Sequence, residues 1–385
     1  MQPVYLDYNA TTPVDPDVLR AMLPFLQGEF GNPSSAYPLG RRAREAIEHA
    51  RAQVAGLIGA SADEITFTGG GTESSNIAIR SGARAAGSRR RIVTTAIEHP
   101  ATDACCALMA REGFEVKRVR PHPDGIVRAE EFKPLVDGGT ALVTVIHAQN
   151  EIGTIQPVAE IASIAKSRGA LMHADAAQSA GKVPLDVGAM GVDLLSIAGH
   201  KLYAPKGVGA LFVRAGLHLP SVLVGAGQEH GRRPGTENVP YIVGLGEACR
   251  IAAQRLQSAD DMRKLADRLL ARLRAEIPDL LLTGDPLRRL PNTLNVLFPE
   301  VSGRRLLDCC PLVSASTGSA CHADREEASA ILRALGLPES RAIGAVRLSL
   351  GRHTTAAEVD AAAAHLIEAW RRLRQEARAA LATAE

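Results

Sequence analysis

The chain has 385 residues, of which 46% are apolar and 22% are charged, proportions that are typical of soluble globular proteins and exclude a wholly disordered chain. Its 44 Lys and Arg residues nearly balance 42 Asp and Glu residues, and the formal net charge of +2 argues against an extended surface for binding nucleic acid. No segment approaches the ~18 apolar residues of a membrane-spanning helix, and the first residues lack the pattern of a signal peptide.

From Ser61 to Val213, short β-rich runs alternate with stretches of helical spacing, which predicts a largely parallel sheet with helices on both faces. The expected strands are Glu64–Thr68, Arg91–Thr95, Ala141–Ile146, Ala170–Ala174, Asp193–Ile197 and Val208–Val213. Apolar residues in Val158–Arg168 recur at helical spacing. The link from Ala198 to Gly207 is short for a parallel crossover, so the last strand is expected to be antiparallel.

The helical run Val243–Arg274 is expected to lead into a smaller domain, in which Asn292–Pro299 and Ala345–Leu350 have the pattern of strands. Near the end, Thr355-Ala-Ala-Glu358 has the form of a capping box. It opens an Ala-rich helix with one apolar face, which is expected to pack rather than to carry function.

The cysteines are expected to be reduced. They are Cys105, Cys106, Cys249, Cys309, Cys310 and Cys321. This spacing gives neither a disulfide framework nor a C-x-x-C zinc motif, so we predict no metal and a cytoplasmic location. The two adjacent pairs and Cys249 have apolar neighbours and are predicted to be small core residues. The segment around Cys321 begins with small and polar residues and continues with charged ones, which predicts an exposed, mobile loop.

A glycine-rich segment indicates a phosphate site. The expected strand that ends at Thr68 runs into Gly69–Gly71, followed by Thr72 and a helix-like stretch. Glycine lets the backbone approach a ligand, and a helix start offers free N–H groups to an anion. The last glycine of a G-x-G-x-x-G motif is missing, and Gly181-Lys182 lacks the following Ser or Thr of a P-loop. A plain glycine-rich turn is the alternative.

Two polar residues follow apolar strands further along. Asp175 stands where open α/β sheets place ligands, and its carboxylate could hold the proton of a heteroaromatic nitrogen or simply cap the next helix. Lys201 lies between apolar runs, where a lowered pKa suits a Schiff base to an aldehyde cofactor. Lys206, beside a proline and a glycine, is read as a surface lysine. A phosphate cradle, an aspartate and a lysine in this order point to pyridoxal 5′-phosphate (PLP).

The chain resembles cysteine desulfurases and selenocysteine lyases, which are PLP enzymes of the class V aminotransferase-like group. The resemblance runs from Tyr5 to about Thr355, nearly the whole chain. Its motifs are Leu6–Pro13, Gly31–Ser35, Thr72–Ser74, Glu98-His99, Gln149–Gly153, Asp175–Gln178, His200-Lys201, Arg233–Asn238, Leu290–Asn295, Gly318–Cys321 and Arg347–Arg352. So many motifs in one order make the assignment specific.

The resemblance implies an α/β fold of PLP fold type I. It predicts a large PLP-binding domain over residues 15–255, built on a mostly parallel seven-stranded sheet. Residues 1–14 and 256–385 are predicted to form a smaller α+β domain that carries the catalytic cysteine loop.

The resemblance also assigns the cofactor contacts. Lys201 is the Schiff-base lysine, Asp175 pairs with the pyridinium nitrogen, and His99 stacks on the ring and moves protons. The other expected contacts are Gly71, Thr72 and His200 at the phosphate, Asn150 and Gln178 beside the phenolic oxygen, and Thr236 reaching the phosphate across a homodimer interface.

The implied reaction removes sulfur from L-cysteine, or selenium from L-selenocysteine, and leaves L-alanine. Arg347 clamps the substrate carboxylate through its bidentate fork, with Asn150 beside it. Lys201 removes the α-proton, and Cys321 attacks the sulfur as a thiolate and carries it as a persulfide to a sulfur- or selenium-acceptor protein. His322, next to Cys321, could favour the thiolate.

The chain departs from the family pattern in two places. Many desulfurases have a hydroxyl residue three positions before the lysine, where this chain has Ala198, so we expect one phosphate donor fewer. Tyr37 replaces the common histidine after Asn-Pro-Ser-Ser and, with Gly-His-Lys201 and Cys321-His, is closer to selenocysteine lyases. The C-terminal tail lacks an obvious apolar peptide for docking to a scaffold protein.

Three other functions stay open on the sequence. A dedicated selenocysteine lyase would use the same residues, and because a selenol is ionised at neutral pH it would need less help from Cys321. An aminotransferase would need a keto-acid partner and no loop thiol. A pseudoenzyme that only carries sulfur is disfavoured, because Lys201 and Cys321 are both present.

Overall fold

The computed structural model describes residues 3–256, 259–318 and 328–382. Its largest sheet has seven strands in the order β2-β8-β7-β6-β5-β3-β4. The strands are β2 (Ile65–Thr68), β3 (Arg91–Thr95), β4 (Glu115–Val119), β5 (Thr140–Ile146), β6 (Leu171–Asp175), β7 (Leu194–Ala198) and β8 (Gly209–Val213). β3 to β7 pair in parallel, and β8 is antiparallel to both neighbours, which confirms the expectation from the short link before it.

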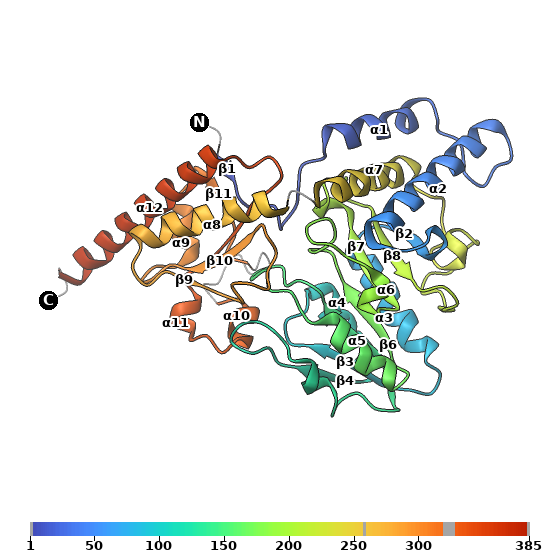
Figure 1. Ribbon diagram of the computed structural model, residues 1–385, viewed down its shortest axis with the longest axis horizontal. Coiled ribbons are helices and arrows are strands. Elements are labelled where there is room, and N and C mark those ends of the chain that lie inside the picture. The colour runs from blue at the N-terminus through green and yellow to red at the C-terminus, as the bar shows by residue number, and fades with distance from the viewer. Residues whose placement is uncertain (1–2, 257–258, 319–327, 383–385) are drawn as a thin grey trace.

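Helices cover both faces of this sheet (Figure 1). They are α1 (Pro16–Gln27), α2 (Pro38–Ile58), α3 (Gly71–Ala85), α4 (Pro100–Arg111), α5 (Val158–Ser167), α6 (Val187–Met190) and α7 (Val239–Arg255). Successive strand residues enter different cores: Leu142 packs with α3 and α4, whereas Val143 packs with the core formed with the other five helices. Strands that are buried on both faces read as continuous apolar runs, which is why the sequence revealed them.

A second group of elements forms a smaller lobe with its own core (Figure 1). Its strands form a sheet of order β12-β10-β9 and a pair β1-β11. They are β1 (Val4–Tyr5), β9 (Leu281–Leu282), β10 (Thr293–Leu297), β11 (Val313–Ser314) and β12 (Ala345–Ser349). The helices are α8 (Ala259–Glu276), α9 (Gly303–Asp308), α10 (Ala330–Ala334), α11 (Glu339–Ala342) and α12 (Ala356–Ala382). The domain boundaries given above stay a prediction.

Two sequence expectations can be compared with the helices of the smaller lobe. The run Val243–Arg274 is helical in both of its described parts, in α7 as far as Arg255 and in α8 from Ala259 onward. The capping box that opens α12 is confirmed: Glu358 N donates to Thr355 Oγ1 over 3.2 Å, and Thr355 N donates to Glu358 Oε2 over 2.7 Å.

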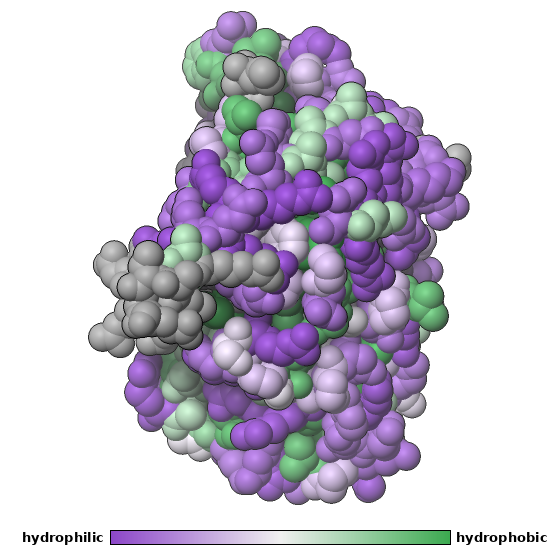
Figure 2. Space-filling model, turned by 90° about the vertical axis from the view of Figure 1, so that its left-hand side faces the viewer, coloured by the Kyte–Doolittle hydropathy of each residue, from purple (hydrophilic) through white to green (hydrophobic). Residues whose placement is uncertain are grey.

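The outer face of the smaller lobe is predominantly hydrophilic (Figure 2). Ion pairs between α8 and α12 contribute to this surface, for example Arg268 with Asp360 over 2.6 Å and Arg371 with Glu276 over 2.5 Å. Within the described residues, no helix is long and apolar enough to cross a membrane.

The N-terminal segment connects the two lobes. β1 pairs in parallel with β11, and Asp7 then bridges to Ser349 at the end of β12. A few residues further on, Thr12 N donates to the carbonyl of His200 over 3.1 Å, beyond the end of β7. The residues between Asp7 and Thr12 therefore lie beside the carboxyl end of β7 in the large sheet.

Candidate active site

Lys201 ends a short 3-10 turn, η3 (Gly199–Lys201), that directly follows β7. Its half-buried Nζ donates to the carbonyls of Asn9 and Ala10, over 2.6 and 2.7 Å. Burial lowers the pKa of Lys201 to about 8, and the positive charge of Arg347 contributes in the same direction. The unprotonated fraction of this amine near neutral pH is therefore much larger than that of an ordinary lysine, which favours its role as a nucleophile for an aldehyde.

Asp175 is the last residue of β6, the strand next to β7. Its Oδ1 accepts from Ala177 N over 2.9 Å, so the carboxylate turns the chain locally but caps no helix. The side chain is buried, and burial raises its pKa, whereas the hydrogen bond from Ala177 and the positive charges of Lys201 and of His99, when His99 is protonated, oppose that shift. A buried carboxylate near cationic groups suits the role of holding a proton on a heteroaromatic nitrogen.

The phosphate cradle predicted from the glycines lies at the N-terminus of α3. Gly70 precedes the helix with φ of 146°, which favours glycine, and Gly71 is the first helical residue. A Cβ at Gly71 would lie 3.0 Å from Ala198 Cβ, so the helix start packs closely on the end of β7. Thr72 is exposed in the first turn, where its hydroxyl and the free N–H groups can meet an anion.

His200 and His99 have different surroundings. His200 is half-buried in η3, with Nδ1 at 3.2 Å from Thr11 Oγ1, and burial with nearby cations, led by Lys201, lowers its pKa to about 4. His99 is the N-cap of α4 and exposes its ring; its Nδ1 accepts from Ala101 N over 3.1 Å. Neutral His99 therefore carries its proton on Nε2. Desolvation lowers the His99 pKa, opposed by the charge of Asp175.

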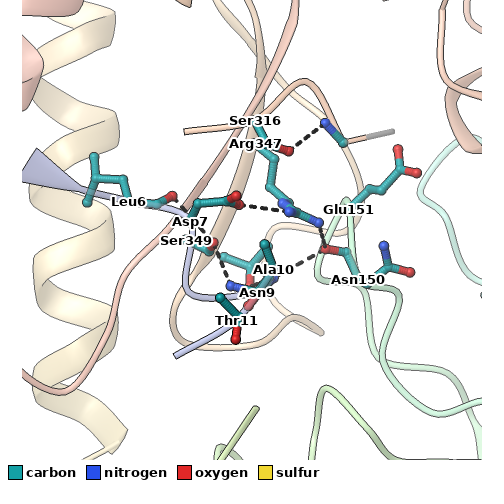
Figure 3. Close-up of polar contacts among 12 residues, drawn as sticks. Leu6, Asp7, Asn9, Ala10, Thr11, Asn150, Glu151, Ser316, Arg347 and Ser349 are labelled. Carbon is teal, nitrogen blue, oxygen red and sulfur yellow. Dashed lines mark hydrogen bonds and ion pairs between the residues drawn. The ribbon is translucent and has the colours of Figure 1, made fainter. Parts of the chain in front are cut away.

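Gln178 and Asn150 meet at the fully buried Asn9. Gln178 Nε2 donates to the Asn9 carbonyl over 2.9 Å, and Asn9 Nδ2 donates to the Asn150 carbonyl over 3.3 Å. Asn9 also donates through its backbone N–H to Ser349 Oγ over 2.9 Å (Figure 3). Asn9 thus connects Gln178 and Asn150, the two residues expected beside the phenolic oxygen, to Lys201 and to β12.

Arg347 extends from β12 toward the same place (Figure 3). Its Nη2 donates to Asp7 Oδ1 over 2.8 Å, and its Nη1 donates to the Asn150 carbonyl over 3.1 Å. The buried Nε has no hydrogen-bond partner among the residues that the structure describes. This guanidinium therefore keeps donor capacity for a carboxylate, as the prediction for the substrate requires.

Among the described residues, one predicted site residue is not brought into this arrangement. Thr236 is exposed in the segment before α7, and its neighbour Arg233 pairs with Glu73 of α3 over 2.9 Å. Cys321 and His322 lie outside the described residues, so the predicted loop stays a prediction.

The remaining cysteines behave as predicted, with one exception. Cys105, Cys106, Cys249 and Cys310 are buried. Burial raises the pKa of Cys105 and Cys310 to about 11 and that of Cys249 to about 12. Such thiols are poor nucleophiles at neutral pH. Cys309 is half-exposed, so its assignment to the core is wrong; it lies at the C-terminus of α9, at the edge of the small core.

These residues fit PLP by the chemistry of their donors. The α3 N-terminus, Thr72 and His200 suit a phosphate group, Asp175 suits a pyridinium, and Lys201 suits an aldehyde. The buried Arg347 Nε without a partner among the described residues suits the carboxylate of an amino acid bound beside the cofactor.

Comparisons with known proteins show the family and its cofactor. The sequence pattern of the family "Aminotransferase class-V" matches residues 4–362, and the chain belongs to this family. The family and the NifS-like desulfurases use pyridoxal phosphate, and PLP is the cofactor of this protein.

The particular relatives are cysteine desulfurases. The chain is 44% identical over 363 residues to the cysteine desulfurase of Nostoc sp. (strain PCC 7120 / SAG 25.82 / UTEX 2576), covering 94% of this chain and 91% of the relative. It is 43% identical over 380 residues to that of Homo sapiens, covering 97% and 83%. Among solved structures, a "NIFS-LIKE PROTEIN" superposes with a TM-score of 0.89 at 38% identity, covering 95% of this chain and 99% of the other. "SspA in complex with cysteine" gives 0.80 at 33% identity, covering 91% and 99%.

Sequence reasoning missed the part played by the N-terminal segment. Asp7 and Asn9 were quoted only as part of a family motif, yet Asp7 orients Arg347, and Asn9 contacts Lys201 and Gln178. The one available signal was the presence of a polar motif directly after the apolar Leu6. Lys182, which was weighed only as part of a P-loop, also donates to Asn9.

Proposed function

We propose that this protein is a cysteine desulfurase that converts L-cysteine to L-alanine. The relatives described above carry that name, and one neighbouring structure contains cysteine. The observation that carries the proposal is the position of the Lys201 amine: it lies against the Asn9 and Ala10 carbonyls, and Arg347 also contacts this N-terminal segment through Asp7. The amine that would react with the cofactor and the guanidinium that would bind the substrate carboxylate are thus held by the same short segment.

The chain's own groups divide the work as follows. Arg347 binds the substrate carboxylate and fixes the orientation of Cα, while Asp7 and Asn150 hold the guanidinium. PLP supplies the electron sink for the pair released when the Cα–H bond breaks. Lys201, whose pKa of about 8 lies near neutrality, accepts that proton and returns it. Asp175 holds the proton on the ring nitrogen, and His99 Nε2 can donate a proton beside the ring.

The finer step in this proposal is sulfur transfer to Cys321. The Cys321 thiolate attacks the substrate sulfur, the substrate C–S bond breaks, and the bonding electrons stay with the substrate carbon, which takes up a proton. L-cysteine and one enzyme thiol thus become L-alanine and one enzyme persulfide, with every atom accounted for. An acceptor protein then takes the outer sulfur.

The test follows L-alanine formed from L-cysteine without any keto acid, which an aminotransferase would require. We expect turnover in wild type, none in Lys201→Ala, and a single extra sulfur atom on Cys321 by mass spectrometry of the intact protein. Borohydride reduction of the PLP-loaded protein should attach the cofactor to the peptide that contains Lys201. Attachment to another lysine would refute the site, and alanine formation only with added keto acid would refute the reaction.

L-selenocysteine is the second candidate substrate. Tyr37 and the Gly-His-Lys201 form favour it, and a selenol ionises more readily than a thiol. Alanine release from both substrates distinguishes the two cases in Cys321→Ala. Loss with cysteine but retention with selenocysteine would support selenide release without a persulfide; equal loss would support Cys321 chemistry for both.

We also propose that the protein acts as a homodimer. The first helix exposes an apolar stripe at spacings of four and three, formed by Leu19, Leu23 and Leu26, and Phe30, three residues beyond the end of the helix, is exposed as well. Phe30 is 75% exposed, which is unusual for a phenylalanine of a monomer. A second copy covers this stripe and brings Thr236 to the phosphate of the opposite site.

Subunit complementation tests the homodimer. Lys201→Ala and Thr236→Ala are purified separately, then mixed and exchanged. If Thr236 acts across the interface, the mixed dimer has one site with both residues intact, so activity rises above that of either parent. No rise in a mixed dimer confirmed by mass would refute the contact, and a monomer in light scattering would refute the dimer.

A cytoplasmic location belongs to the same proposal. It is supported by the free thiols Cys105, Cys106, Cys249, Cys309 and Cys310. Cell fractionation with compartment markers tests it, and recovery of the protein in an oxidising compartment would refute it.

A further inference from the structure

A second lysine, Lys182, lies close to Lys201. Both line one cavity of about 350 Å³. Lys182 is half-buried, and its Nζ donates to Gln178 Oε1 over 2.9 Å and to Asn9 Oδ1 over 3.0 Å. Neither of these acceptors carries a charge, although buried amines are usually paired with carboxylates. An ion pair with these two acceptors therefore does not explain why Lys182 lies here.

The Gln178 amide is fixed from both of its ends. The Asn9 carbonyl can only accept, so the atom at 2.9 Å from it must be the donor Nε2. Lys182 donates to the other atom, Oε1. Nε2 carries two protons, and the Asn9 carbonyl takes only one of them. No other acceptor for Nε2 lies among the residues that the structure describes, so one N–H of Gln178 is left for an acceptor in the site.

We propose that Lys182 is a positioning residue: by donating to Gln178 Oε1, it keeps the amide turned so that N–H, rather than C=O, is presented to the cofactor. The inference rests on the proposed function, in which Gln178 lies beside the phenolic oxygen of PLP. That oxygen is an acceptor, and a reversed amide would set two acceptors against each other.

The charge on Lys182 does not decide this role. Burial lowers its pKa well below the ordinary value, and the cations Lys201 and Arg347 lower it further. The opposite charges that act on Lys201 are Asp7 and Asp175. An amine keeps N–H donors in either protonation state, so both hydrogen bonds persist across the titration.

The experiment measures binding of PLP to the cofactor-free protein and the absorbance of the complex against pH. Lys182→Met keeps the side-chain length and removes the donors; Lys166→Met, on the exposed face of α5, is the matched control. We expect Lys182→Met to raise the Kd for PLP about three- to tenfold, the effect of one hydrogen bond, and the control to change it less than twofold. The midpoint of the absorbance titration should move upward, because an oxygen without its donor holds a proton more tightly.

A double-mutant cycle separates positioning from simple structural support. In a Gln178→Ala background, Lys182→Met should neither weaken PLP binding by more than twofold nor move the absorbance midpoint further. Equal effects in both backgrounds, or no effect in either, would overturn the inference. Lys182→Leu carries the same cycle if Lys182→Met does not fold. Failure of wild type to bind PLP would instead refute the proposed function.

Discussion

The contact between Ala198 and α3 allows a direct test of the phosphate cradle. Ala198 is 3% exposed, and its Cβ lies 3.0 Å from the place that a Cβ on Gly71 would occupy. A hydroxyl at this position therefore adjoins the free N–H groups at the start of α3. Ala198→Ser restores the hydroxyl that many desulfurases carry, without the additional methyl of threonine.

The expected effects have opposite signs with and without PLP. In the PLP-free protein, a buried hydroxyl whose proton has no acceptor costs about 1 kcal/mol of stability. In the complex it can donate to a phosphate oxygen, and hydrogen bonds to charged groups contribute about 1.5–3 kcal/mol. At 1.4 kcal/mol for each factor of ten, PLP should bind about tenfold more tightly or better.

Two measurements on one protein check this reasoning. Urea unfolding gives the stability of the PLP-free form, and fluorescence titration gives the Kd for PLP. Ala162→Ser, at a buried position of α5 away from the site, is the control: it should lose similar stability with no change in Kd. An unchanged or weaker Kd in Ala198→Ser, with the protein folded, would show that no phosphate binds at this helix start.

Three further predictions concern charge and burial. Asp7→Asn removes the negative charge 2.8 Å from the buried Arg347 cation, so we expect a loss of about 1–3 kcal/mol in urea unfolding and a KM for cysteine that rises more than kcat falls. Unchanged values would contradict the orienting role. Burial lowers the pKa of His173 to about 3, so below pH ~6.5 the unfolded state binds more protons than the folded state. As the pH falls, this group alone should therefore reduce the free energy of unfolding by about 1.4 kcal/mol per pH unit. His173→Asn should lose stability less steeply between pH 7 and 5, and equal slopes in the two proteins would refute this explanation. Cys249, with a pKa raised to about 12, should be alkylated at least about a hundredfold more slowly than half-exposed Cys309 in the folded protein, and comparable rates by peptide mass spectrometry would show that the core opens.

The sheet was predictable because burial on both faces leaves a strong pattern in the sequence. β3 (Arg91–Thr95) occurs at the predicted residues, and other strands differ by one or two positions. β4 (Glu115–Val119) escaped prediction because it is an edge strand whose charged, partly exposed residues interrupt the apolar run.

Much of the candidate site followed from local motifs, and the rest depends on long-range contacts. Lys201 and Asp175 could be proposed because each directly follows a buried strand. Asn9 could not, because its partners Asn150 and Thr293 lie 141 and 284 residues away, and no periodicity connects them. The family resemblance supplied residue roles, but not the hydrogen bonds through which the N-terminal segment supports them.

The short stretch from Val4 to Ala10 has a practical consequence for anyone producing this protein. It begins in the smaller lobe beside β11 and ends with the carbonyls that hold the reactive amine. An affinity tag, fusion partner or proteolytic trim at the front of the chain therefore acts within a few residues of the chemistry. A tag placed after α12 avoids that interference, and a preparation cleaved near Ala10 would lose both acceptors of Lys201 while leaving every core helix intact.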